Sequence, residues 1–346
     1  MQKIMKSTAL AAGIAMMAPV AAQALVININ PVTGGGLDTG ASAAAALAAF
    51  NRAADRWEAV FSDPITVEID ADLRDLGSPT IIGQASSTLL LGSFNVIRDA
   101  MVLDASDESD DAIVGFLPSS AGFSAFLPED FSLLDAIILT QANALALGFP
   151  RLAPSDALIE FNSGFSFDFD NSDGVVGMDF ETVALHEIGH ALGFISVVDE
   201  IDFRIATDQP DEVAVRPLDL FRFGDLANPS STSDFTSFAR WLVPSFPGFF
   251  DDLDVELAFS TGQFTGDGRQ ASHWRDEDLS DDLLGVMDPT LPFNTIYPLS
   301  ENDLRALDRI GWDYLLRSHD IPEPITLSLM GAGLAGVGWM RRRRAA

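Results

Sequence analysis

The feature that most constrains this chain is a pair of histidines four positions apart, His186 and His190, with Glu187 directly after the first. Residues at this spacing lie one above the other on the same side of an α-helix. The preceding residues, 178–185, carry helix formers and apolar side chains at helical spacing. Both imidazoles can then reach one zinc ion, and Glu187 can act on a metal-bound water. The pattern predicts the zinc helix of a peptidase.

A chance match on a buried helix is the alternative interpretation of this short pattern. The whole protein has four histidines, so half of them lie in the motif. Gly189 and Gly193 each cost about 1 kcal/mol inside a helix relative to alanine. Gly193 falls where the helix would end, and a glycine there can cap it and reverse the chain. Such a reversal is what a third metal ligand arriving from elsewhere would need.

The first residues, 1–24, are typical of a secretory signal peptide. Lys3 and Lys6 give a positive start, residues 7–21 are mostly apolar, and Ala22-Gln23-Ala24 is a small-residue cleavage site. Cleavage is therefore expected after Ala24, and export across the inner membrane with it. The chain has no cysteine, which excludes disulfides, thiolate ligands and a cysteine nucleophile.

The last part of the chain, residues 319–346, has three parts in order. A Pro-Glu-Pro sequence at 322–324 precedes an apolar stretch at 325–340, and four arginines at 341–344 follow. This tail resembles the PEP-CTERM sorting signals of Gram-negative bacteria. The resemblance implies recognition by an exosortase-type membrane protease and delivery to the cell surface or extracellular matrix. A simple transmembrane anchor is the alternative, although sixteen residues are short for a span.

The body of the chain is strongly acidic. Both lysines precede residue 25 and four arginines follow residue 340, so residues 25–340 hold 14 arginines against 51 acids. A body with this charge repels nucleic acid and anionic lipid, so we expect no nucleic-acid partner and membrane contact only through the tail. Calcium binding would fit the charge, and Asp168, Asp170 and Asp173 are dense enough for it. Their spacing does not match a calcium loop, and a turn is favoured.

The body is predicted to be α+β. We expect helices at 41–61, 93–103 and 135–147, strands at 65–73, 157–161 and 165–169, an extended segment at 80–91 and an acidic loop at 104–111. The apolar stripe of the first helix comprises Ala46, Phe50, Ala53, Ala54 and Trp57. These elements would place a sheet above the active-site helix.

A peptidase zinc site usually has three protein ligands and an open position. Ser196, three residues after Gly193, is a poor zinc ligand. Asp199 and Glu200 follow closely and are alternatives. His273, which lies beside Trp274 and is one of the two remaining histidines, is the favoured third ligand.

The 186–194 motif, a distant His273-Trp274 and a Met287 turn at 285–289 together resemble the leishmanolysin-type metzincins. The similarity extends to residues 300–312, a capped helix ending in Ile-Gly-Trp. The resemblance implies a metzincin-like zinc peptidase domain at 25–318. Its N-terminal subdomain, about 41–194, would hold a mixed sheet and the active-site helix, and its irregular or helical C-terminal subdomain, about 195–318, the Met-turn. It also implies His186, His190 and His273 as zinc ligands, Glu187 as general base and Met287 beneath the metal.

The sequence therefore predicts a secreted or surface-sorted zinc-dependent endopeptidase acting on protein or peptide substrates. Substrate would lie extended along a sheet edge, for which residues 165–169 are the candidate. A non-catalytic surface or extracellular-matrix protein with a structural or vestigial metal site is the alternative. A site completed by a downstream glutamate ranks last, because no suitable helix carries one.

Overall fold

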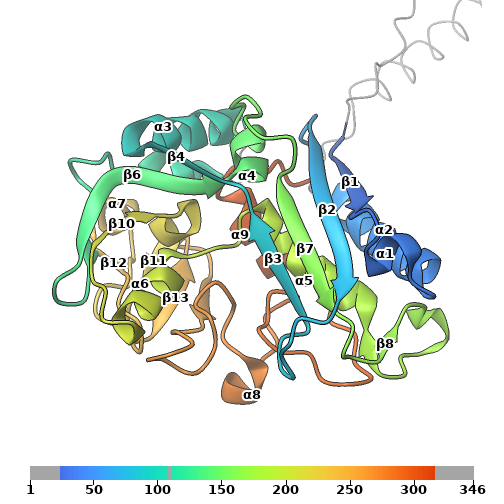
Figure 1. Cartoon of the computed structure of the whole chain (residues 1–346). Helices are drawn as coiled ribbons and strands as arrows, with labels where there is room; N and C mark the ends of the chain where they lie inside the picture. Colours follow the sequence, from blue (N-terminus) through green and yellow to red (C-terminus); the bar gives the residue numbers. More distant parts are fainter. Residues whose placement is uncertain (1–23, 108–110, 316–346) are drawn as a thin grey trace, which may run out of the picture.

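The structure is a computed structural model that describes residues 24–107 and 111–315. The predicted sorting tail and all but the last residue of the predicted signal peptide lie outside the described residues. Within those two described ranges, no helix has the length and apolarity that a membrane crossing requires. The described chain is α+β, with several small sheets and helices, and Figure 1 shows these elements arranged in two halves.

The main sheet has four strands in the order β1 (Val26–Pro31), β2 (Thr66–Arg74), β7 (Ala157–Asn162) and β3 (Gly83–Ser87). The first three strands run parallel, and β3 is antiparallel to β7 at the edge. In β2 the apolar residues at every second position are buried on one face, as its alternating sequence predicts. The predictions of strands at 65–73 and 157–161 are confirmed.

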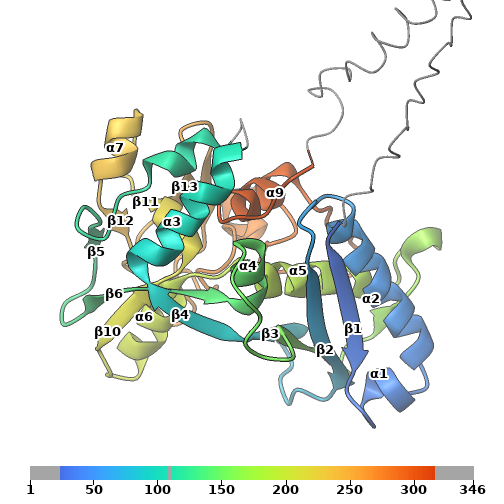
Figure 2. The same cartoon turned by 90° about the horizontal axis from the view of Figure 1, so that it is seen from above.

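Two helices, α2 (Ala43–Glu58) and α5 (Phe180–Leu192), pack against each other on the buried face of this sheet (Figure 2). The five stripe residues predicted for the first helix are all buried. Trp57 fixes the contact, because its indole N–H donates to the carbonyl of Leu185 at 3.1 Å. The short α1 (Gly36–Thr39) lies between β1 and α2 in the chain. The main sheet thus holds the predicted zinc helix from one side.

A second sheet lies in the other half of the molecule, in the order β10 (Glu212–Val215), β6 (Ser132–Thr140) and β4 (Leu89–Ser93). Helix α3 (Phe94–Asp104) packs on it, which confirms the helix predicted at 93–103. The helix predicted at 135–147 is wrong in its first half. That half forms β6, because pairing with β4 and β10 outweighs the local preference, and only α4 (Gln141–Ala146) is helical.

The two halves do not follow the order of the sequence. The prediction groups residues 41–194 in one subdomain, yet β6 pairs with β10 and β5 (Ala125–Phe126) pairs with β12 (Arg240–Trp241). The segment from β4 to β6 therefore packs with the C-terminal half, as Figure 1 shows. The remaining elements of that half are α6 (Val197–Ala206), β11 (Arg222–Phe223), α7 (Thr232–Ser237), β13 (Gly248–Asp251), β14 (Glu256–Phe259), α8 (Glu277–Ser280) and α9 (Glu301–Asp308).

The segment before α5 forms less strand than predicted. Only β8 (Phe167–Asp168) is extended, and it pairs with β9 (Met178–Asp179). The carboxylate of Asp168 accepts hydrogen bonds from the backbone N–H groups of Asp170 and Val176, at 3.0 and 2.8 Å. These bonds are those of the favoured turn.

Candidate metal centre

The predicted zinc helix, α5, has defined ends that set the positions of its histidines. Asp179 caps its start by accepting a hydrogen bond from the N–H of Thr182 at 3.0 Å. Gly193 ends it with a φ of +126°, a conformation that favours glycine. The N–H of Phe194 then bonds the carbonyl of Gly189 at 3.0 Å and turns the chain away. The predicted helix and its glycine stop are both present.

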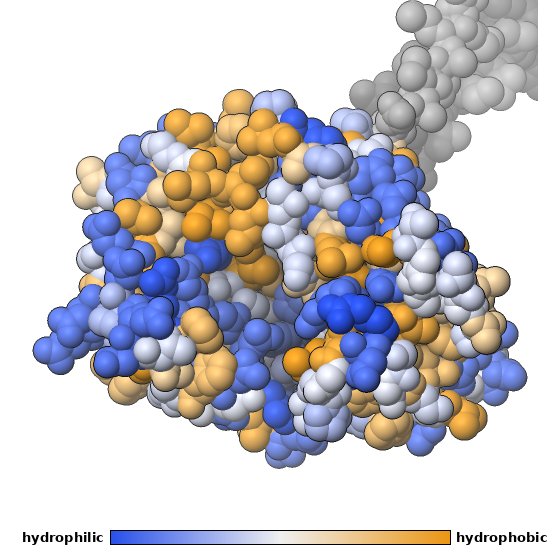
Figure 3. Space-filling view, in the orientation of Figure 1, coloured by the Kyte–Doolittle hydropathy of each residue, from blue (hydrophilic) through white to orange (hydrophobic). Residues whose placement is uncertain are grey.

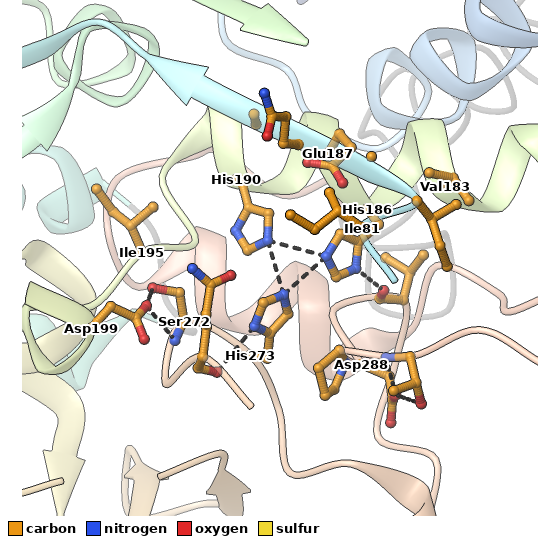
Figure 4. Close-up of a pocket in the computed structure, with 18 of the residues that line it drawn as sticks. Ile81, Val183, His186, Glu187, His190, Ile195, Asp199, Ser272, His273 and Asp288 are labelled. Atoms are coloured by element: carbon orange, nitrogen blue, oxygen red, sulfur yellow. Dashed lines mark hydrogen bonds between the residues drawn. The ribbon is translucent and has the colours of Figure 1, made fainter. Parts of the chain in front are cut away.

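Three histidine side chains converge at one point, as Figure 4 shows. The Nε2 atoms of His186 and His273 are 3.0 Å apart, and that of His190 is 3.1 Å from each. A tetrahedral zinc with bonds of about 2.0–2.1 Å holds its nitrogen ligands about 3.3 Å apart, so the spacing fits a zinc ion closely. Within the described residues, no fourth histidine or carboxylate joins the group.

Each imidazole is oriented by its other ring nitrogen. The Nδ1 atoms of His186, His190 and His273 lie 2.8, 2.8 and 3.0 Å from the backbone carbonyls of Val286, Phe194 and Gln270 respectively. A carbonyl can only accept, so Nδ1 carries the proton in each neutral ring. All three Nε2 atoms then face one another with lone pairs. This arrangement is repulsive by itself and becomes favourable around a cation.

Burial keeps these rings neutral. It lowers the pKa of His186 to about 4. The pKa of His190 falls to about 3, through burial and then through the nearby His186. Burial, followed by the charges of the other two rings, also lowers the pKa of His273 well below its usual value. Neutral imidazoles are the form that binds a metal, so the site is ready for an ion at neutral pH.

Glu187 is buried beside this group and is 5% exposed. In the part of the chain that the structure describes, the carboxylate of Glu187 accepts no hydrogen bond and forms no ion pair. Burial alone raises its pKa to about 8. Its Oε1 lies against β3, since a Cβ added at Gly83 would be 2.8 Å from it. A buried carboxylate without a protein partner is suited to exchange a proton with a ligand in the site.

The chain holding His273 is fixed by Asp199, which the sequence offered as an alternative third ligand. The carboxylate of Asp199 instead accepts hydrogen bonds from the N–H groups of Ala271 and Ser272, the latter at 3.0 Å, and from the Ser272 hydroxyl. Ser196 caps α6, and its N–H donates to that same hydroxyl at 2.9 Å. Both residues therefore position the third histidine, and neither belongs to the histidine group.

Met287 packs against α5 on the turn predicted to lie under the metal. It is fully buried, and a Cβ added at Gly189 would lie 2.3 Å from its sulfur. Gly189 therefore has a packing role, because only the absence of a side chain permits this approach. The neighbouring Val286 supplies the carbonyl that orients His186.

Asp303 is a residue of this site that the sequence does not reveal. Its buried carboxylate accepts from the N–H groups of Val286 and Met287 at 2.8 and 3.2 Å, and from the indole of Trp274 at 2.8 Å. It also caps α9 by accepting from Ser300. The capping sequence predicts the helix start, but the same carboxylate also joins the turn at 285–289 to Trp274, the residue after His273.

An open cleft of about 690 Å³ passes over the histidines and Glu187. Figures 3 and 4 show it as a hollow between the two halves, with polar and apolar walls. Strand β3 forms one wall, and the segment predicted as the substrate edge, 165–169, does not line the cleft. The apolar residues that line the cleft include Ile81, Ile82, Leu89, Val183, Ile195 and Leu291.

A family model described as the PEP-CTERM protein-sorting motif matches residues 320–344. This match confirms the tail predicted from its three parts. The motif indicates export and sorting to the cell surface of a Gram-negative bacterium, and it implies recognition by an exosortase-type processing enzyme. Comparisons with curated proteins and with solved structures give no match.

Proposed function

We propose that the chain is a surface-sorted, zinc-dependent endopeptidase with a metzincin-like domain. The observation that carries this proposal is the convergence of three Nε2 lone pairs within 3.1 Å, each set by a carbonyl on the other ring nitrogen. His186, His190 and His273 would hold the ion. Zinc bound by three neutral imidazoles lowers the pKa of water toward about 7 and polarises a carbonyl.

Glu187 is the proton carrier of the proposed reaction. Its carboxylate faces the cleft without a protein partner, and burial raises its pKa to about 8. Without an ion in the site, a carboxyl with such a pKa holds a proton near neutral pH. A bound cation would favour the charged carboxylate, which could then take a proton from water and release it to a leaving nitrogen. The proton would be held on an Oε atom of Glu187. Oε1 occupies space that is free because Gly83 has no side chain.

Strand β3 can orient an extended peptide. The N–H of Asn162 donates to the carbonyl of Ile82. The main-chain N–H and C=O groups of the even-numbered residues of β3 therefore point toward β7. The main-chain groups of the alternate residues of a strand point to its other side, away from the paired strand. Gly83, Ala85 and Ser87 therefore present their main-chain groups to the cleft, which they line. Pairing with them would hold a substrate backbone beside Glu187.

The alternative of a structural metal site would be favoured by four protein ligands and no open position. The group has three histidines, and it opens onto a cleft. The arrangement therefore favours the enzyme over a non-catalytic surface protein.

The test is Glu187→Gln in the zinc-loaded protein, assayed on an unfolded protein substrate. We expect zinc content to stay the same and hydrolysis to fall by about 10²–10⁴-fold, because the proton carrier is lost. Glu129→Gln, at an exposed position, is the matched control and should change neither quantity. Unchanged turnover in Glu187→Gln would refute the role of Glu187.

A further inference from the structure

Residues 81–97, which run from just before β3 into the first turn of α3, have an unusual composition. They contain no charged residue and no proline, although 21% of the chain is charged. They include β3, an edge strand of the four-stranded sheet, and β4, an edge strand of the three-stranded sheet that contains β6 and β10. Free edges are normally protected by charges, prolines or a covering element, because they otherwise pair with another chain. An unprotected edge beside a cleft is open to pairing with an extended peptide.

The free side of this edge is continuous across the junction of the two strands. The N–H of Thr88 donates to the carbonyl of Asp156, which precedes β7, at 2.8 Å. The carbonyl of Thr88 accepts from the N–H of Gln141, which follows β6, also at 2.8 Å. Both partners therefore lie on the same side of the strand. By alternation, the main-chain groups of odd-numbered residues from Gly83 to Leu91 face the opposite, open side. We call this the 83–91 edge.

The part of the edge formed by β4 also carries an apolar face. Leu89 is 50% exposed and Leu91 is 66% exposed, and Leu91 lies opposite Ile138 on β6. The other face of this pair is covered by α3, since a Cβ at Gly92 would lie 2.7 Å from the side chain of Ile97. Leu89 also lines the cleft, so the apolar face is continuous with the site. Figure 3 shows apolar surface running from this region to the central hollow.

We propose that the β4 part of the 83–91 edge binds the amino-terminal side of an extended peptide substrate with apolar side chains at alternate positions. This inference rests on the proposed peptidase function. A peptide pairing antiparallel with β3, the more stable arrangement, has its amino-terminal residues beside Leu89 and Leu91. Its alternate side chains then form cross-strand contacts with these two leucines.

The geometry sets the length of peptide that can use this surface. Leu89 and Leu91 are six and eight residues beyond Gly83, which lies against the catalytic Glu187. At about 3.3 Å per residue this is roughly 20–26 Å. A peptide must therefore extend about six to eight residues toward its amino end from the residue beside Gly83. Shorter peptides gain nothing from the surface.

The test measures binding in the zinc-loaded Glu187→Gln variant, which should hold a peptide without cleaving it. Two uncharged fluorescent peptides of about twelve residues are compared, one with leucines at alternate positions of its amino-terminal half and one with serines there. We expect the leucine peptide to bind about tenfold more tightly. Adding Leu91→Ser should weaken the leucine peptide about fivefold and leave the serine peptide unchanged.

Leu226→Ser is the control, because Leu226 is 87% exposed in a turn that does not line the cleft. It should change neither affinity. Equal affinities of the two peptides, or the same tight binding after Leu91→Ser, would overturn the inference. So would a stable dimer that Leu91→Ser dissociates, because a second copy would then cover the face. Hydrolysis by the unmutated protein is measured separately, so loss of the peptide preference is distinguishable from loss of the peptidase function.

Discussion

Asp303→Asn tests how the proposed metal centre is held together. Asp303 is fully buried and accepts five hydrogen bonds, two on Oδ1 and three on Oδ2. An asparagine has one acceptor oxygen and one donor nitrogen in their place. Whichever way the amide points, at least two donors lose their acceptor.

The magnitude follows from those bonds. Each hydrogen bond to a charged group contributes about 1.5–3 kcal/mol, so two lost bonds destabilise by about 3–6 kcal/mol. Burial raises the pKa of Asp303, which shows that the buried charge has its own cost. Removing that charge offsets part of the loss, and we expect the free energy of unfolding to fall by about 2–4 kcal/mol. Zinc affinity should fall about 10–100-fold, because Val286 and Trp274 no longer fix two of the histidines.

Chemical unfolding gives the first quantity and competition with a zinc-binding dye gives the second. Asp225→Asn, at an exposed turn position, is the control and should leave both unchanged. An Asp303→Asn variant with normal stability and normal zinc affinity would contradict the role given to this carboxylate. Loss of stability with normal zinc affinity would show that the carboxylate supports the fold alone.

Three further predictions concern single positions. Gly189→Ala should lower the free energy of unfolding by about 1–3 kcal/mol in denaturant titration, because its Cβ would lie 2.3 Å from the Met287 sulfur. Gly83→Ala should lower kcat about tenfold with zinc content unchanged, since its Cβ displaces the Glu187 carboxylate; an unchanged kcat counts against that placement. Burial raises the pKa of Asp63 to about 7. Between about pH 4 and 7, Asp63 therefore keeps its proton in the folded state and loses it in the unfolded state, so the free energy of unfolding falls as pH rises through this range. Asp63→Asn should therefore stabilise the protein by about 1–3 kcal/mol at pH 8 and have little effect near pH 4; an equal gain at both pH values would refute this.

The sequence predicts the parts of this molecule that depend on local pattern. The spacing of His186 and His190 requires only that the segment be helical, and Gly193 marks where the helix ends. No local pattern connects His273 to His186 and His190, which it meets in the structure. Its prediction depends on the rarity of histidine in this chain and on the family resemblance.

The parts that could not be predicted depend on contacts between distant segments. Residues 135–140 have helix-compatible side chains and become β6, because β4 and β10 offer partners on both sides. The acids Asp199 and Asp303 look like many others in a chain with 51 of them. Their roles follow from backbone N–H groups that only the folded chain brings to them.

The most direct test is the zinc content of the purified protein compared with that of His273→Ala. If three imidazoles hold the ion, the unmodified protein binds one zinc per chain, and the variant loses it at a free zinc concentration that still saturates the unmodified protein. X-ray absorption should report three nitrogen ligands of imidazole type at about 2.0 Å in the unmodified protein. A His273→Ala variant that retains one zinc with the same affinity would contradict the account.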